Sequence, residues 1–311
     1  KKISINSKMI KKNDVFFAIK GKRLDGNRYV GEALKQRSSL VIVNQINKDY
    51  PVLRQIKVKN TLSFLTKCSS IFRENIKTKI ISITGSCGKT TLKEMIGLSL
   101  KEISKTTYSP KSFNNKYGVP LSLFNLKQND DFGVLEVGMD KKGEIDNLTK
   151  IIKPDLGIIT NISYAHSKNF RSIKLIAAAK AEIINNIKSG GSVVLNMDDN
   201  FYKYHKSLAL KKKLKVISFG IKNKSAMTKL IKIKKIKNKY ELLIKINGSS
   251  LAIYSQNDNQ NHLYNILATL AVVNLFADIK KLNKDFFLNF KTPIGRGDIS
   301  KVKFKNKQIF L

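Results

Sequence analysis

A glycine-rich loop at residues 85–91 is the segment of this sequence best suited to chemistry. It stands between an apolar run, 79–84, and a helical pattern that starts at Thr91. A helix that starts after such a loop presents free N–H groups and a partial positive charge to a phosphate. Lys89 would reach the β- and γ-phosphates of a nucleotide, and the Thr90 hydroxyl would coordinate magnesium. The loop therefore predicts binding of ATP with Mg²⁺ by Gly85, Ser86, Cys87, Gly88, Lys89, Thr90 and Thr91.

The glycine spacing of this loop departs from the common pattern. A usual phosphate loop has four residues between its two glycines, whereas only Ser86 and Cys87 separate Gly85 from Gly88, and Ile83 occupies the expected first glycine position. An incidental Gly-Lys-Thr turn would read the same way. The strand pattern before the loop and the helix pattern after it favour a shorter form of the phosphate loop.

Four further residues could serve a phosphoryl-transfer site, and each also has an ordinary explanation. Glu136 ends an apolar run, where a carboxylate could hold magnesium or simply face solvent. His166 and Lys180 could be a core or surface histidine and a solvated lysine. Arg296 lies between two glycines, where it could face a γ-phosphate or belong to an ordinary loop.

Strand and helix patterns alternate around these residues. Such alternation predicts a mostly parallel sheet covered on both faces. A smaller α/β unit precedes it, with strands at 1–5, 15–19 and 40–43 and helices at 29–37 and 62–73. For the larger unit we expect strands at 79–84, 132–137, 156–160 and 192–196, and helices at 91–100, 121–126, 173–186 and 262–277.

The stretch 214–255 follows a different pattern, because its apolar runs are separated by short turns. We expect an antiparallel meander of strands 214–219, 230–236, 240–246 and 251–254, attached to the parallel sheet. The predicted fold class is therefore α/β. A small N-terminal α/β domain, 1–78, precedes a P-loop central domain, 79–298, and residues 299–311 begin a further segment.

The chain is strongly basic, with 59 Lys and Arg against 22 Asp and Glu and a net charge of +37. This balance is compatible with nucleic-acid binding. However, the lysines are dispersed apart from 211–215 and 229–239, and Trp is absent. Such dispersal favours a compositional bias of solvated faces, and it also suits small anionic substrates such as nucleotides.

Location is addressed by two features of the sequence. It contains no run of 18 apolar residues, so no membrane span is expected, and residues 1–5 have no apolar signal core. Its two cysteines, Cys68 and Cys87, cannot form a disulfide framework, and Cys87 lies inside the phosphate loop. The small number of cysteines and the position of Cys87 favour a reducing cytoplasm.

The loop resembles the ATP loop of the Mur ligases, enzymes that add amino acids to the peptide of the peptidoglycan precursor. The resemblance covers nearly the whole chain, about residues 1–298, and further segments agree with this family in order and spacing. They are 112–120 (Ser-Phe-Asn-Asn-Lys-Tyr-Gly-Val-Pro), 135–145 (Leu-Glu-Val-Gly-Met to Gly-Glu-Ile), 160–166 (Thr-Asn-Ile-Ser-Tyr-Ala-His), 179–183 (Ala-Lys-Ala-Glu-Ile) and, near the N-terminus, 6–8, 13–21 and 25–27.

The resemblance implies a role for each candidate near the phosphates. Glu136 and His166 would be magnesium ligands, and Arg296 would face the γ-phosphate. The lysine equivalent to Lys180 is carbamylated in these ligases, which turns a cation into a carboxylate-like group that supports magnesium. Carbamylation needs a neutral amine, and hence a pKa lowered by burial or by nearby cations.

Nucleotide and precursor contacts are implied for five other residues. The family reads His-Asn-x-x-Asn where residues 261–265 read Asn-His-Leu-Tyr-Asn, so the first two residues are exchanged and the third is retained. An Arg is common in the family at the position of Lys8. The implied contacts are Asn115, His262 and Asn265 for the nucleotide and Ser7 and Lys8 for the uridine end of the precursor.

Within the family, the Phe-Asn-Asn and Val-Gly-Met wording favours members that add D-alanyl-D-alanine to UDP-N-acetylmuramoyl-tripeptide. The implied reaction converts the terminal carboxylate of the precursor to an acyl phosphate, which the amine of the dipeptide then attacks. We expect a monomer. Three alternatives remain open. The first is a sibling ligase, which adds either the third residue of the precursor peptide or glutamate to folate. The second is a basic P-loop protein that binds nucleic acid, and the third is a non-catalytic nucleotide-binding remnant.

Family members carry an Asp-Ser-Tyr-Asn-Ala-Asn-Pro segment and a third domain beyond the Gly-Arg-Gly turn at 295–297. No such segment occurs before Leu311. We therefore expect a fragment that by itself binds nucleotide weakly and catalyses poorly.

Overall fold

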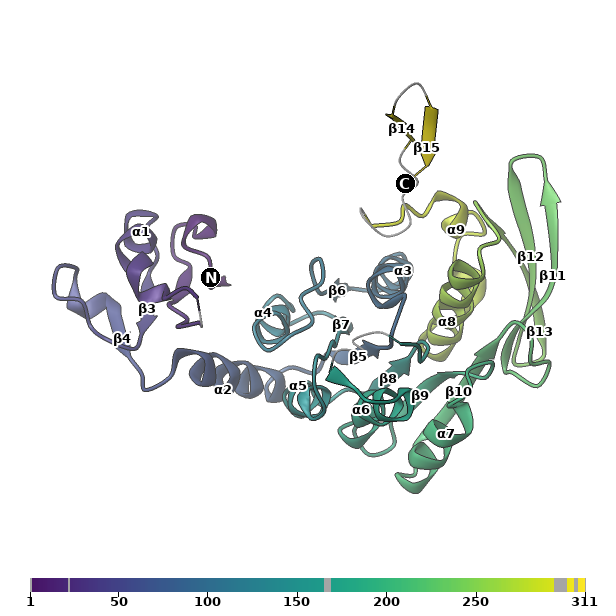
Figure 1. The fold of residues 1–311 in the computed structure, drawn as a ribbon, viewed down its shortest axis with the longest axis horizontal. Helices are drawn as coiled ribbons and strands as arrows, with labels where there is room; N and C mark the ends of the chain where they lie inside the picture. The colour runs from purple at the N-terminus through teal and green to yellow at the C-terminus, as the bar shows by residue number, and fades with distance from the viewer. Residues whose placement is uncertain (1, 22, 165–168, 294–300, 305–306, 311) are drawn as a thin grey trace.

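Residues 2–21, 23–164, 169–293, 301–304 and 307–310 are described by the structure, which is a computed structural model of the chain. The N-terminal part is a four-stranded parallel sheet with helix α1 beside it, and helix α2 leads from it to a larger sheet (Figure 1). Its elements are β1 (Ile3–Ser4), β2 (Val15–Phe17), α1 (Val30–Lys35), β3 (Leu40–Val43), β4 (Gln55–Lys57) and α2 (Thr61–Glu74), with 3₁₀ turns at Ser7–Met9, Gly26–Tyr29 and Val52–Arg54.

The larger sheet has nine strands in the order β13-β12-β11-β10-β9-β8-β5-β7-β6. Neighbours from β11 to β6 pair in parallel, and the β11–β12 and β12–β13 pairs are antiparallel. The mostly parallel sheet with an antiparallel end confirms the predicted fold class. The strands are β5 (Lys79–Thr84), β6 (Thr106–Tyr108), β7 (Phe132–Glu136), β8 (Leu156–Ile159), β9 (Ser192–Asn196), β10 (Lys215–Gly220), β11 (Thr228–Ile236), β12 (Lys239–Ile246) and β13 (Ser249–Ser255).

Helices cover both faces of this sheet and form two separate apolar cores. Helices α3 and α8 close one face, and α4 to α7 contribute to the core on the other. The central strand β5 is buried from Ile80 to Thr84, as its continuous apolar run requires in a doubly covered sheet. The helices are α3 (Lys89–Lys101), α4 (Gly118–Phe124), α5 (Glu144–Ile152), α6 (Ile173–Asn185), α7 (Tyr202–Lys211), α8 (Gln260–Phe276) and α9 (Phe286–Asn289), with a 3₁₀ turn at Ile279–Lys281; β14 (Lys301–Phe304) and β15 (Lys307–Phe310) form a separate hairpin.

Two predicted elements were placed incorrectly. The run 214–219 was expected to belong to the antiparallel meander, but β10 pairs in parallel with β9 and β11, because the helix α7 lies between β9 and β10 and returns the chain to the same sheet edge. The helix expected at 121–126 begins at Gly118. Pro120 lies in its first turn, where a missing N–H costs no helical hydrogen bond. Helices α5, α7 and α9 and strands β4 and β6 were not predicted.

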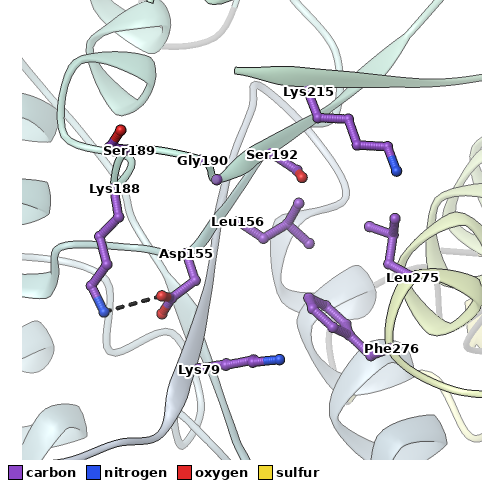
Figure 2. Close-up of a pocket in the computed structure, with 11 residues that line it drawn as sticks. Lys79, Asp155, Leu156, Lys188, Ser189, Gly190, Ser192, Lys215, Leu275 and Phe276 are labelled. Carbon is purple, nitrogen blue, oxygen red and sulfur yellow. Dashed lines mark hydrogen bonds and ion pairs between the residues drawn. The ribbon is translucent and has the colours of Figure 1, made fainter. Parts of the chain in front are cut away.

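The C-terminal end of α2 is tied to the larger sheet by an ion pair between Arg73 and Asp155. Arg73 is buried and donates to the carbonyls of Ile76, Thr78, Ile152 and Lys153 as well as to the Asp155 carboxylate at 3.1 Å. Asp155 also accepts from the Ile80 N–H at 2.8 Å and from Lys188 Nζ at 3.0 Å. Figure 2 shows Asp155 and Lys188 beside a hollow at the amino ends of the strands, the sheet edge opposite to loop 85–91.

We expect Asp155→Ala to lower the free energy of unfolding by about 2–4 kcal/mol, because it leaves the buried Arg73 guanidinium without a counter-charge. Urea unfolding would measure the change. Lys188→Ala is the matched control: its ammonium is half exposed, so that loss should be below about 1 kcal/mol. Equal losses in the two variants would contradict this account of Asp155.

Within the described residues, no helix is both long and apolar enough to cross a lipid bilayer.

Candidate active site

Loop 85–91 joins the carboxyl end of β5 to the start of α3, as the sequence predicted. Gly85 and Gly88 adopt φ values of +149° and +81°, a region that residues other than glycine rarely enter. A Cβ at Gly85 would lie 1.8 Å from the Thr160 hydroxyl, and one at Gly88 would lie 3.1 Å from the Asn265 side-chain oxygen. Gly85 is therefore required by the close approach of Thr160, and Gly88 is favoured by its positive φ.

Residues 160–163, which follow β8, hold the loop in place. Asn161 accepts the N–H of Ser86 through its carbonyl at 2.9 Å and the N–H of Cys87 through its side chain at 3.0 Å. The Thr160 hydroxyl donates to the Cys87 carbonyl at 2.7 Å, and the Ser86 hydroxyl is bonded to the backbone of Ser163. Since two loop amides are engaged, the N–H groups most available to a phosphate are those of the first turn of α3, which lack helical partners.

Glu136 lies at the carboxyl end of β7, directly across from the start of α3. Its side chain is 1% exposed. One carboxylate oxygen accepts from the Thr90 hydroxyl at 2.8 Å and the other from the Asn114 amide at 2.7 Å. The structure thus brings together two predicted magnesium ligands, Thr90 and Glu136. The sequence analysis assigned no role to Asn114, which also contacts Glu136.

Two lysines converge on a single carbonyl at the base of the loop. Lys180 is 1% exposed and its amine donates to the Gly85 carbonyl at 2.9 Å, and the Lys89 amine donates to the same oxygen at 2.8 Å. Burial, and secondly the charge of Lys89, lower the pKa of Lys180 to about 7. The amine of Lys180 is therefore neutral in a large fraction of molecules at neutral pH.

A hollow of about 590 Å³ opens between the loop and the α4 and α5 region. Asn115 borders it, but its side-chain oxygen accepts the N–H groups of Tyr117 and Gly118 and so caps the start of α4. Asn115 therefore borders the same hollow as Lys89, while its side-chain oxygen is engaged by the start of α4. The lining residues are Lys89, Asn114, Asn115, Lys116, Tyr117, Gly138, Met139, Asp140, Glu144, Asn147 and Leu148.

A smaller hollow of about 50 Å³ lies on the other side of the loop, against the first turns of α8. Asn261, Tyr264 and Asn265 line it together with Cys87 and Gly88. His262 is absent from this lining; its Nε2 is buried without a hydrogen-bond partner, and burial lowers the pKa of the imidazole to about 4. The exchange of Asn and His at 261–262 thus leaves Asn261, not His262, facing the loop.

Asp198 fixes the position of α8 beside this hollow. It accepts from the backbone N–H groups of residues 221–223 and from the Tyr264 hydroxyl at 3.1 Å. Burial and the charge of Asp198 raise the pKa of Tyr264 to about 12, so this hydroxyl remains a donor at neutral pH. Asp198 follows the carboxyl end of β9, and nothing in its sequence context singled it out.

Four predicted site residues are not among those described above. His166 and Arg296 lie outside the described residues. Ser7 is buried in the N-terminal part, where its hydroxyl donates to Glu32 at 2.7 Å, and Lys8 is exposed. Among the described residues, no group of three or more His, Cys, Asp or Glu side chains converges in a way that could hold a metal ion.

Comparison with known proteins places this geometry in a family. Residues 83–273 match the Mur ligase middle domain. The chain belongs to the Mur ligase family. The matched region runs from the end of β5 to within α8, so it contains the loop, Glu136 and Lys180.

Curated relatives of the chain are Mur ligases that add D-alanyl-D-alanine. The UDP-N-acetylmuramoyl-tripeptide–D-alanyl-D-alanine ligase of Rickettsia prowazekii is 31% identical over 304 residues, which are 97% of this chain and 67% of that protein. The corresponding ligase of Bacillus subtilis is 33% identical over 198 residues, 63% of this chain and 43% of that protein. The chain thus spans between two fifths and two thirds of the length of these relatives.

Solved Mur ligase structures share the whole described fold. The structure of MurF from Acinetobacter baumannii matches all of this chain and 67% of its own, with a TM-score of 0.86 and 25% identity. MurF from Thermotoga maritima, solved in complex with ADP, matches 97% of this chain and 69% of its own, with a TM-score of 0.83 and 27% identity. These matches confirm the predicted family and fold.

Proposed function

We propose that this Mur ligase catalyses the ATP-dependent addition of D-alanyl-D-alanine to UDP-N-acetylmuramoyl-tripeptide. The observation that carries the proposal is the contact between the buried Glu136 carboxylate and the Thr90 hydroxyl at the start of α3. A buried carboxylate and a hydroxyl at a phosphate loop are the protein ligands that Mg²⁺ takes beside nucleotide phosphates. The curated relatives are named as ligases that carry out this addition.

Thr90 and Glu136 would hold magnesium, and the bound ion would neutralise charge on the transferred phosphoryl group. Their donor atoms fit a hard divalent cation, since both are oxygens and Asn114 fixes the second carboxylate oxygen. Lys89 would leave the Gly85 carbonyl and turn to the β- and γ-phosphates. The first turn of α3 would supply the N–H donors that the loop lacks, and Asn261, Tyr264 and Asn265 would line the base of the nucleotide.

Lys180 would act after carbamylation. Its buried amine, with a pKa lowered to about 7, meets the requirement of a neutral form for reaction with carbon dioxide. The resulting carbamate would carry a negative charge beside Lys89 and the magnesium ligands. His166 and Arg296 would complete the site as a second magnesium ligand and as a cation at the γ-phosphate, respectively. Ser7 and Lys8 would contribute to the uridine site. Lys8 departs from the family pattern, in which an Arg is common at this position.

With these groups in place, the main contributions of the protein would be to position the substrates and to neutralise charge on the transferred phosphoryl group. The carboxylate of the precursor peptide attacks the γ-phosphorus of ATP, which releases ADP and forms an acyl phosphate. The amine of D-alanyl-D-alanine then attacks the acyl carbon, and the amide forms as inorganic phosphate and a proton leave. A cytoplasmic location and a monomeric state remain predictions of the sequence.

In a full-length version of the protein, we expect D-alanyl-D-alanine to stimulate phosphate release from ATP when the tripeptide precursor and Mg²⁺ are present. Lys89→Met should reduce this release at least a hundredfold, because Lys89 neutralises the transferred phosphoryl group. Lys116→Met, a second lysine at the same hollow, is the control and should stay within a few-fold. Stimulation by meso-diaminopimelate, lysine or glutamate in place of the dipeptide would instead identify a sibling ligase.

A further inference from the structure

The hairpin of β11 and β12 ends in an arm, residues 231–239, that has little protein around it. Leu230, Leu242 and Ile244, in the inner half of the hairpin, belong to the core that includes α8. In the arm, by contrast, every residue from 231 to 235 is exposed, as are 237 and 238. The hairpin extends beyond α8 at the right-hand border of Figure 1. The outer part of the hairpin is therefore packed less tightly than the rest of the sheet, although Ile233 lies opposite the buried Leu242.

The arm consists almost entirely of lysine and isoleucine. It contains five lysines and three isoleucines, and no Asp or Glu occurs anywhere in 221–239. The nearest acid in the strand register is Glu241, which lies opposite Lys234. Closely spaced ammonium groups with so little compensation create a local positive potential that attracts an anionic surface.

Protection of a sheet edge accounts for the lysines but not for the isoleucines. From residue 230 onward β11 pairs only with β12 in the described structure, and lysines on such an edge discourage pairing with another chain. Ile231, at an irregularity in the β11–β12 register, is 42% exposed, and Ile233 is 37% exposed. Two partly exposed isoleucines among these lysines give the arm an amphipathic character that edge protection alone does not require.

We propose that this basic arm binds the surface of an anionic lipid bilayer. Lysines on both faces of β11 contact phosphate headgroups, and Ile231 and Ile233, which alternate with them along the strand, contact the interfacial region. Nucleic acid fits less well, since 221–239 contains no Arg and no aromatic residue. The adjacent rings of Tyr240 and Tyr254 are covered by the amines of Lys235 and Lys239, so they offer no open stacking platform for bases.

The test measures partition of the chain onto vesicles of equal parts phosphatidylcholine and phosphatidylglycerol, with pure phosphatidylcholine vesicles as reference. Each lysine near an anionic surface contributes roughly fivefold in affinity. The triple change Lys232→Gln, Lys234→Gln and Lys235→Gln should therefore weaken partition about a hundredfold. The control, Lys203→Gln, Lys206→Gln and Lys211→Gln on the exposed side of α7, removes the same charge and should lose less than about fivefold.

A fluorescent reporter separates insertion from electrostatic contact alone. The chain contains no Trp, so Ile233→Trp places a single indole in the arm and Leu210→Trp places one on α7, where Leu210 is 55% exposed. Anionic vesicles should shift the emission of the first to shorter wavelength and leave the second unchanged. Equal losses in the two triple variants, no shift at position 233, or binding of duplex DNA that displaces the vesicles would each overturn the proposal.

Discussion

Lys180→Met is expected to raise the free energy of unfolding at pH 6 by about 2–4 kcal/mol. The pKa of Lys180 is about 7 in the folded protein, below its value in an unfolded chain. The unfolded state therefore binds more protons between pH 7 and about pH 10, and the stability of the unmodified protein rises with pH across that window. Methionine removes the buried charge, so the gain is largest below pH 7 and fades towards pH 10.

Urea unfolding at several pH values would measure this difference. The control is Lys174→Met, an exposed lysine of the same helix, which should change stability by less than about 0.5 kcal/mol at any pH. In ¹³C-labelled bicarbonate, we further expect a carbamate resonance that the Lys180→Met protein lacks. A pH-independent difference between the Lys180→Met variant and the parent would contradict the lowered pKa of Lys180, whatever the activity of either protein.

Glu136→Gln is expected to weaken binding of ADP in the presence of Mg²⁺ by at least tenfold and to change binding without Mg²⁺ little. Glutamine keeps the shape of the side chain and can still accept from Asn114, but it lacks the charge that a magnesium ligand needs. Calorimetric titration with and without the metal would measure the two affinities. The difference between them, not the absolute affinity, reports on the metal.

Glu144→Gln is the matched control, because Glu144 borders the same hollow and bonds only to the backbone N–H groups of Asp140 and Lys141 in the described contacts. It should leave the effect of Mg²⁺ within about twofold of the parent. If Glu136→Gln weakened binding equally with and without Mg²⁺, the carboxylate would have a structural role only, holding Thr90 and Asn114.

The phosphate loop and Glu136 could be predicted from the sequence because each depends on a short local pattern. A buried parallel strand needs a continuous apolar run, and the residue that follows it must lie at the sheet edge. The lowered pKa of Lys180 could be anticipated only through the family resemblance. Its physical cause, burial beside Lys89, depends on two segments that are 91 residues apart in sequence.

The contacts that sequence reasoning missed are all formed between distant segments. Asn161 bonds to the loop, Asn114 bonds to Glu136, and Asp198 bonds to Tyr264, yet each of these polar residues lies where a turn would place one anyway. The error at β10 has a similar origin. An alternating run shows that a strand exists, but only the chain path through α7 decides whether its neighbour is parallel.

Helix α2 holds the N-terminal sheet and the larger sheet at a fixed separation. At its first turn the Thr61 hydroxyl bonds to the Ala18 carbonyl, and Leu65 packs with Phe17 and Ile42 of the N-terminal sheet; at its last turn Arg73 is held by the larger sheet. Its 14 residues span about 20 Å. If the uridine end of a precursor binds at the N-terminal sheet, its carboxylate reaches the loop only when the intervening peptide matches this span. The length of α2 would then select substrates by the length of their peptide.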